Sequence, residues 1–187
     1  MADRRSNLRI ATMPAHERLD AVVNRARFFD SREGYATYLI ATWQARSQAE
    51  TELCASAGEF FRLWPLHQIA WALHLDIEDV TGLGSFLPGR TEDNCRFDTV
   101  GKFLGALYVL EGSALGARVL STRAASLGMR RDFGARHFAL QTSRPMAWSN
   151  FLAVLEATPL DAVQEQDCLT AAMKMFIQFE RAYTEVG

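Results

Sequence analysis

The chain has 187 residues, of which 49% are hydrophobic and 22% charged, and its formal net charge is −2. That length suits one sizeable domain, and the composition excludes an intrinsically disordered chain. The small net charge argues against nucleic acid or an anionic membrane as a partner. The N-terminus lacks an apolar signal segment, no stretch approaches about 18 uninterrupted apolar residues, and the three cysteines form no C-x-x-C pair. We therefore expect a single cytoplasmic domain over residues 1–187.

Helical periodicity extends along nearly the whole chain, and no alternating run of β-branched residues is long enough to predict a strand. The first predicted helix covers about residues 12–29. Pro14 has no backbone N–H to donate and therefore suits a first turn, with Thr12 as the N-cap. Two further helices are expected over residues 33 to about 57 and over residues 64–79.

The second half of the chain begins with T-G-L-G-S-F-L-P-G-R-T-E-D-N-C-R-F, which predicts a loop over residues 81–97. A long helix is expected next, with Asp98 as its N-cap, Leu127 at its end and Gly128 as the C′ residue. A polar connection containing His137 leads to a helix over residues 145–157 and, after T-P-L-D, to a last helix over residues 160–186. The whole pattern predicts a single all-α domain.

The long predicted helix carries four glycines on one narrow face: Gly101, Gly105, Gly112 and Gly116. Tyr108 borders the same strip. Each interior glycine costs about 1 kcal/mol relative to alanine, so four of them need a reason. Either a neighbouring helix packs closely against the strip, or a flat ligand lies across it. Periodicity alone leaves both interpretations open.

One of the four histidines has the spacing of a metal ligand. Asp20 follows His16 by four residues on the same helix face, where its carboxylate can accept one ring N–H and orient the ring. Taken alone, a histidine near a helix start is more often a surface residue or a satisfied core residue than a metal ligand. His67 and His74 lie opposite the apolar stripe of their predicted helix and are expected in solvent. The chain has no E-x-x-H, C-x-x-C-H, Walker A, G-x-G-x-x-G or G-x-S-x-G motif, so the sequence gives no support for di-iron, c-type haem, nucleotide or serine hydrolase sites.

Two segments together resemble the haem oxygenase family: L-R-I-A-T-M-P-A-H-E-R-L-D at residues 8–20 and L-G-A-L-Y-V-L-E-G-S-A-L-G-A-R-V-L at residues 104–120. The likeness is greatest to bacterial members associated with bacteriophytochromes. It extends over most of the chain, because F-L-A-V-L-E-A-T-P-L and F-I-Q-F-E also fall where the family has similar segments. The resemblance implies the single-domain helical haem-oxygenase-like fold.

On the proximal side, the resemblance implies that His16 ligates haem iron and that Asp20 holds its ring. Arg9 matches a cation near a haem propionate, which suits a charge-assisted contact. Met13 stands where a second cation is common in the family.

On the distal side, Gly112 and Gly116 match glycines that let the backbone lie over the iron, and Tyr108 is expected to contact haem beside them. Ser113 stands where many members have an aspartate that organises distal water, although serine is familiar in bacterial members. Ala117 replaces the second glycine of a common G-G pair. The resemblance thus implies catalytic roles for Gly112, Ser113 and Gly116.

The implied reaction is oxidative opening of haem to biliverdin with release of iron and carbon monoxide. Haem is both cofactor and substrate, O2 is the co-substrate, and electrons come from a ferredoxin, a flavodoxin or a reductase. A bacteriophytochrome would be a possible acceptor of the product. Two other classes stay open: a non-catalytic haem- or bilin-binding protein on the same fold, and another enzyme of this fold with a different small molecule.

Overall fold

The computed structural model describes residues 3–83 and 96–186 of the chain. The regular structure in these residues is helical: α1 (Arg4–Arg25), α2 (Arg32–Ser56), the 3-10 helix η1 (Gly58–Arg62), α3 (Ala70–Thr81), α4 (Val100–Ser126), α5 (Arg136–Thr142), α6 (Ala147–Ala157) and α7 (Ala162–Val186). The all-α prediction is therefore confirmed. Most of the loop predicted over residues 81–97, including Cys95, lies outside the described residues.

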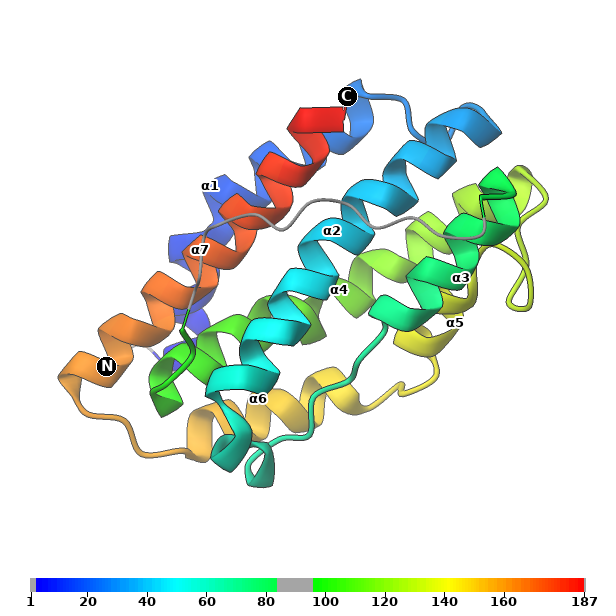
Figure 1. Ribbon diagram of the computed structural model, residues 1–187. Helices are drawn as coiled ribbons and strands as arrows, with labels where there is room; N and C mark the ends of the chain where they lie inside the picture. The colour runs from blue at the N-terminus through cyan, green and yellow to red at the C-terminus, as the bar shows by residue number, and fades with distance from the viewer. Residues whose placement is uncertain (1–2, 84–95, 187) are drawn as a thin grey trace.

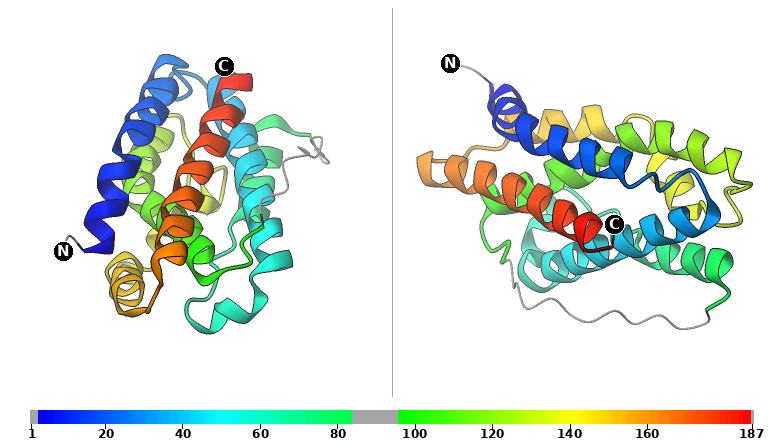
Figure 2. Two further views of the ribbon diagram at one scale, coloured as in Figure 1. Left: turned by 90° about the vertical axis from the view of Figure 1, so that its left-hand side faces the viewer. Right: turned by 90° about the horizontal axis from the view of Figure 1, so that it is seen from above.

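Helix α7 lies at the centre of the arrangement and packs against α1, α2 and α4 (Figure 1). α1 and α7 run side by side in the same direction, because Arg4 pairs with Glu165 near their starts and Arg18 pairs with Glu180 near their ends. α2 runs in the opposite direction along another side of α7 (Figure 2). Three long helices thus share one central partner.

The first helix begins at Arg4, eight residues earlier than predicted, with Asp3 accepting a hydrogen bond from the backbone N–H of Ser6 at 2.6 Å. Pro14 lies inside the helix. The helix tolerates it because Pro14 and Ile10 are both exposed, so water can satisfy the Ile10 carbonyl that Pro14 leaves without its helical donor. Thr12 is no N-cap.

The third helix begins at Ala70, not near Trp64, because a side chain from α2 caps it. The carboxylate of Glu50 accepts the backbone N–H groups of Ile69 at 2.8 Å and of Ala70 at 3.2 Å. Arg46 pairs with the same carboxylate at 2.7 Å, and both side chains are buried. A cap supplied from twenty residues away leaves no local signature in the sequence.

Neither of the two histidines predicted in solvent is fully exposed, and only one of them belongs to α3. His67 precedes the helix and is partly buried, and burial lowers its pKa. His74 is within α3 and pairs with Glu78 at 3.3 Å. The prediction of a solvated pair on one helix is therefore wrong.

The later helix boundaries agree with the sequence to within a few residues. Thr99, rather than Asp98, caps α4 and accepts from the backbone N–H of Lys102, and α7 begins at Ala162. Gly128 has a φ of 85°, as expected for the C′ residue of α4. α4 is long and apolar enough to cross a membrane by those criteria alone, but half of its most apolar window is buried inside the fold, as in the core helix of a globular domain.

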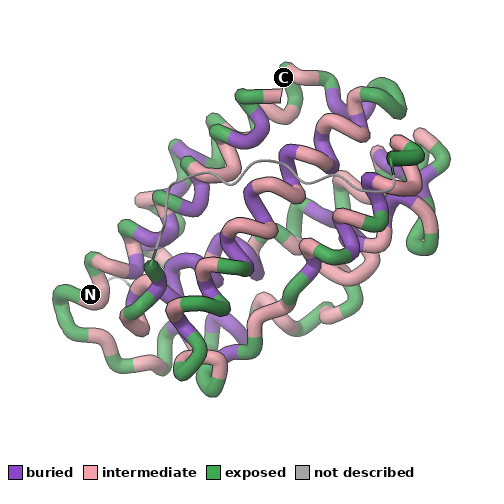
Figure 3. The backbone as a smooth tube through the Cα atoms, viewed as in Figure 1, coloured by how far each residue is buried: buried purple, intermediate pink, exposed green. Residues whose placement is uncertain are grey.

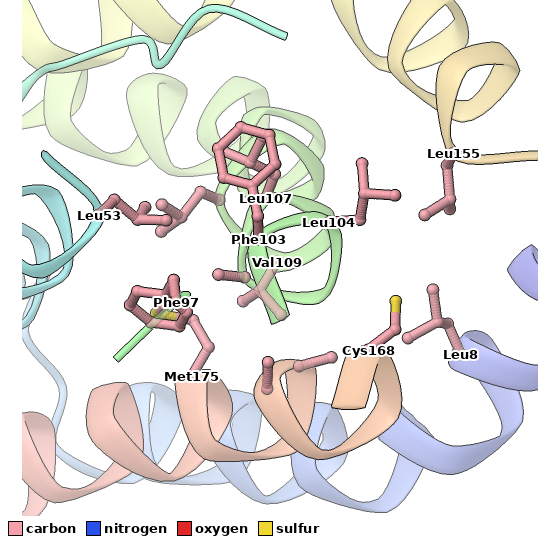
Figure 4. Packing of buried hydrophobic residues seen from close by; sticks show 14 of the residues in the cluster. Leu8, Leu53, Phe97, Phe103, Leu104, Leu107, Val109, Leu155, Cys168 and Met175 are labelled. Carbon is pink, nitrogen blue, oxygen red and sulfur yellow. The ribbon is translucent and has the colours of Figure 1, made fainter. Parts of the chain in front are cut away.

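The buried side chains form two clusters, one around the first half of α4 and one around its second half. Figure 3 marks the buried residues along the backbone. In the first, Phe103, Leu104 and Leu107 of α4 meet Cys168 and Met175 of α7 (Figure 4). The second is rich in aromatic rings, which come from the connection between α1 and α2, from α2 itself, from α5 and from the end of α7. The first half of α4 is therefore surrounded by core.

The sequence predicts His137 in a polar connection, and this is wrong. His137 is fully buried in α5, where its Nδ1 lies 2.7 Å from Oδ2 of Asp76 on α3. Burial lowers the pKa of His137, and the hydrogen bond and charge of Asp76 oppose that effect only in part. The pair ties α5 to α3.

Candidate functional site

The first two glycines of the α4 strip serve helix packing. A Cβ atom at Gly101 would lie 2.1 Å from the carbonyl oxygen of Gln164, and one at Gly105 would lie 2.1 Å from that of Cys168. Both oxygens belong to the backbone of α7, so neither position has room for a side chain. For these two residues the packing interpretation is confirmed.

The other two glycines are not required by any neighbour in the described residues. A Cβ atom at Gly112 would meet only ring atoms of Trp148 at 3.5 Å, an ordinary contact, and one at Gly116 would meet nothing within 4 Å. Leu115 and Val119 beside them are 52% and 65% exposed. We refer to Gly112, Leu115, Gly116 and Val119 as the open face of α4.

Helix α1 runs along this open face. At one end, Thr12 of α1 lies close enough to Tyr108 of α4 to lower the pKa of its hydroxyl, and at the other end Arg123 donates to Asn24 Oδ1 at 3.4 Å. The two helices therefore run in the same direction. His16 follows Thr12 by four residues on α1, and Gly112 follows Tyr108 by four residues on α4. Both therefore lie about 6 Å further along their helices than the Thr12–Tyr108 contact. His16 and the start of the open face are level with one another.

The imidazole of His16 is 61% exposed, and its Nδ1 lies 3.1 Å from Oδ2 of Asp20. When Nδ1–H donates to that carboxylate, the lone pair of Nε2 is left for a metal. No group of three or more His, Cys, Asp or Glu residues in the described part of the chain could hold a metal ion. His16 can therefore serve only a metal that brings its other ligands with it.

Two arginines of α1 lie near the start of the open face. Burial raises the pKa of Tyr108, while Thr12 and the charges of Arg5 and Arg9 act in the opposite direction. Both guanidinium groups are thus within electrostatic reach of the Tyr108 hydroxyl. Sequence reasoning named Arg9 and missed Arg5, although the four-residue spacing puts them on one helix face.

The hydroxyl of Ser113 is already engaged on the side of α4 that faces α5. It donates to the carbonyl of Leu110 at 2.6 Å and accepts from Nε2 of Gln141 at 2.9 Å. Its catalytic role stays a prediction. Trp148, which covers Gly112, was missed because nothing in the local sequence of α6 indicates what its indole contacts.

Comparison with known proteins identifies the family. A family model described as Heme oxygenase matches residues 3–185. The chain belongs to the haem oxygenase family. It is 31% identical to heme oxygenase PigA from Pseudomonas aeruginosa over 180 residues, which cover 94% of this chain and 89% of that protein. A heme oxygenase from Xanthomonas campestris pv. campestris is 38% identical over 79 residues, or 40% of this chain and 46% of that one.

The haem oxygenase fold is also found among solved structures. Heme oxygenase from Neisseria meningitidis, solved with NO and CO bound, has a TM-score of 0.85 at 23% identity, covering 100% of this chain and 92% of that one. The enzyme from Leptospira interrogans has a TM-score of 0.74 at 17% identity, covering 98% and 100%. At these identities the likeness shows the fold alone, and it confirms the predicted fold class.

Proposed function

We propose that this haem oxygenase family member opens haem oxidatively to biliverdin, releasing iron and carbon monoxide and consuming O2 and external electrons. The observation that carries the proposal is the divided glycine strip. The fold requires Gly101 and Gly105, but not Gly112 and Gly116, each of which costs about 1 kcal/mol of helix stability. Two costly glycines on an exposed apolar face, level with an available imidazole, fit a flat metal-containing ligand.

The chemistry of the donor set fits haem. A porphyrin brings the other nitrogen ligands of its iron, so a single imidazole, that of His16, would be enough from the protein. Exposed apolar side chains flank the site on both helices, namely Met13 on α1 and Leu115 on α4. Arg5 and Arg9 suit the carboxylates of the ligand.

Each side chain then has a defined task. Nε2 of His16 would bind the iron, and Asp20 would hold the ring through Nδ1. Gly112 and Gly116 would keep the other side of the ligand free of side chains. Haem itself supplies the oxygen activation when bound, so the protein contributes binding and orientation.

The Ser113 hydroxyl is the group of α4 proposed to act on distal water. Its proton is committed to the Leu110 carbonyl, so it can accept a hydrogen bond from distal water but donates only if that bond breaks. Gln141 fixes the hydroxyl from α5. The residue would therefore orient water rather than deliver a proton directly.

The reaction requires a reductant, and we propose a ferredoxin, a flavodoxin or a reductase as the source of electrons. A bacteriophytochrome is the proposed acceptor of the bilin. A cytoplasmic location goes with these partners, which are themselves cytoplasmic classes of protein.

The decisive experiment is reconstitution with haemin, followed by addition of a reducing system and O2. Replacement of the Soret band by a biliverdin spectrum is expected. A stable ferric or oxy spectrum would instead indicate a haem- or bilin-binding protein without turnover. His16→Ala should abolish the axial bond and turnover, whereas His74→Ala, at a partly exposed histidine of α3, should leave both unchanged. Unchanged turnover in His16→Ala would refute the ligand assignment.

A further inference from the structure

The open face of α4 is closed at one end by a single side chain. The six-membered ring of Trp148 from α6 lies against Gly112, with Cη2 and Cζ3 both 3.5 Å from where a Cβ would be. Gly116, one turn further along, has nothing within 4 Å of that position. A flat ligand on α4 therefore has free access at Gly116 and meets an indole at Gly112.

The indole packs against two aromatic rings and also borders a small hollow. Its ring packs against Tyr108 at 5.4 Å and is stacked on Phe151 at 6.1 Å between ring centroids. The hollow has a volume of about 20 Å³, is lined in part by Arg118 and Gln141, and has room for about one water molecule. The indole is therefore not enclosed by packed side chains on every side.

The backbone that carries Trp148 is also lightly held. Trp148 is the second residue of α6, and the N-cap position, Met146, makes no side-chain capping bond. Met146 is itself exposed. An indole on an uncapped first turn can adjust its position at little cost.

We propose that Trp148 contacts the tetrapyrrole and determines which of its edges lies over Gly112, and thereby which meso carbon is opened. The inference rests on the proposed function. Haem is nearly symmetric apart from its peripheral substituents, so rotated orientations differ mainly in what those substituents meet. An indole at one end of an otherwise open face discriminates between substituents of different size and charge, while Arg5 and Arg9 act on the carboxylates.

The test is the isomer composition of biliverdin formed by the wild type, Trp148→Phe and Trp148→Ala. Pocket changes of this size alter discrimination by about tenfold or more, so we expect the isomer ratio to shift by about tenfold in Trp148→Ala and less in Trp148→Phe. Trp71→Ala removes an indole of α3 that is 56% exposed and serves as the matched control. Its isomer ratio should equal that of the wild type.

A second readout does not depend on turnover. The rate of haemin association, followed by the Soret band, should rise in Trp148→Ala because the face over Gly112 no longer has to be cleared. Far-ultraviolet circular dichroism of both variants confirms that α6 is folded, and Trp148→Phe retains an aromatic ring if alanine perturbs the helix. Wild-type isomer ratios and association rates in both variants would overturn the inference while leaving the proposed function intact. Failure of the wild type to form biliverdin would instead refute the proposed function.

Discussion

Replacing Gly116 with alanine should make the ligand-free protein more stable, and replacing Gly105 should make it less stable. At Gly116 the new methyl group meets nothing within 4 Å, so the gain in helix propensity of about 1 kcal/mol is unopposed. For a chain of this size, that gain raises the melting temperature by about 2–4 °C. At Gly105 the methyl would lie 2.1 Å from the backbone oxygen of Cys168, which must move. Overpacking of this kind costs about 1–3 kcal/mol or more.

The assay is thermal and urea unfolding of both ligand-free variants by circular dichroism, followed by titration with haemin. Gly116→Ala should bind haemin more weakly despite its greater stability, because the methyl group stands on the face reserved for the ligand. The changes in the free energy of unfolding should therefore have opposite signs in the two variants. If Gly116→Ala destabilises the protein as much as Gly105→Ala does, the open pair of glycines is needed for packing just as the first pair is.

Three other predictions follow from contacts described above. Asp20→Asn alters an exposed contact with His16, so it should change the free energy of unfolding by less than about 1 kcal/mol while weakening haemin binding through His16. A loss of unfolding free energy well above that limit would show a structural role instead. Burial lowers the pKa of His137 below its ordinary value of 6.5, so the unfolded chain binds the proton more tightly and stability should decline as the pH falls below about 6.5. His137→Gln should reduce that decline between pH 7.5 and pH 5.5 in urea unfolding, and an unaltered slope would exclude His137 as its source. Glu50→Ala leaves Arg46 buried without its partner and uncaps α3, which should cost about 3–5 kcal/mol; a loss below about 1 kcal/mol would show that the pair is dispensable.

The features that could be predicted from the sequence are those whose physical cause is local. Helical periodicity identified α1 to α4, α6 and α7 but not α5, and Gly128 marked the end of α4 because a positive φ favours glycine. The pairing of His16 with Asp20 follows from four-residue spacing and is present in the structure at 3.1 Å. The family resemblance rested on the same short segments.

The features that could not be predicted have a cause far away in the chain. Asp76 lies 61 residues before His137 and makes it a buried residue of α5. Both pairs of glycines in the α4 strip have the same four-residue spacing. Only the path of α7 therefore distinguishes the packing pair from the open pair. Trp148 approaches Gly112 from another helix.

Pro14 makes α1 easier to bend close to His16. The proline removes one helical hydrogen bond two residues before His16, in a helix that Arg4 and Arg18 join to α7 on both sides of that position. A helix bends most easily where such a hydrogen bond is missing. A small bend at Pro14 would therefore change the distance between the imidazole and α4 while the contacts with α7 stay in place. One site would then hold both a flat closed ring and an open chain.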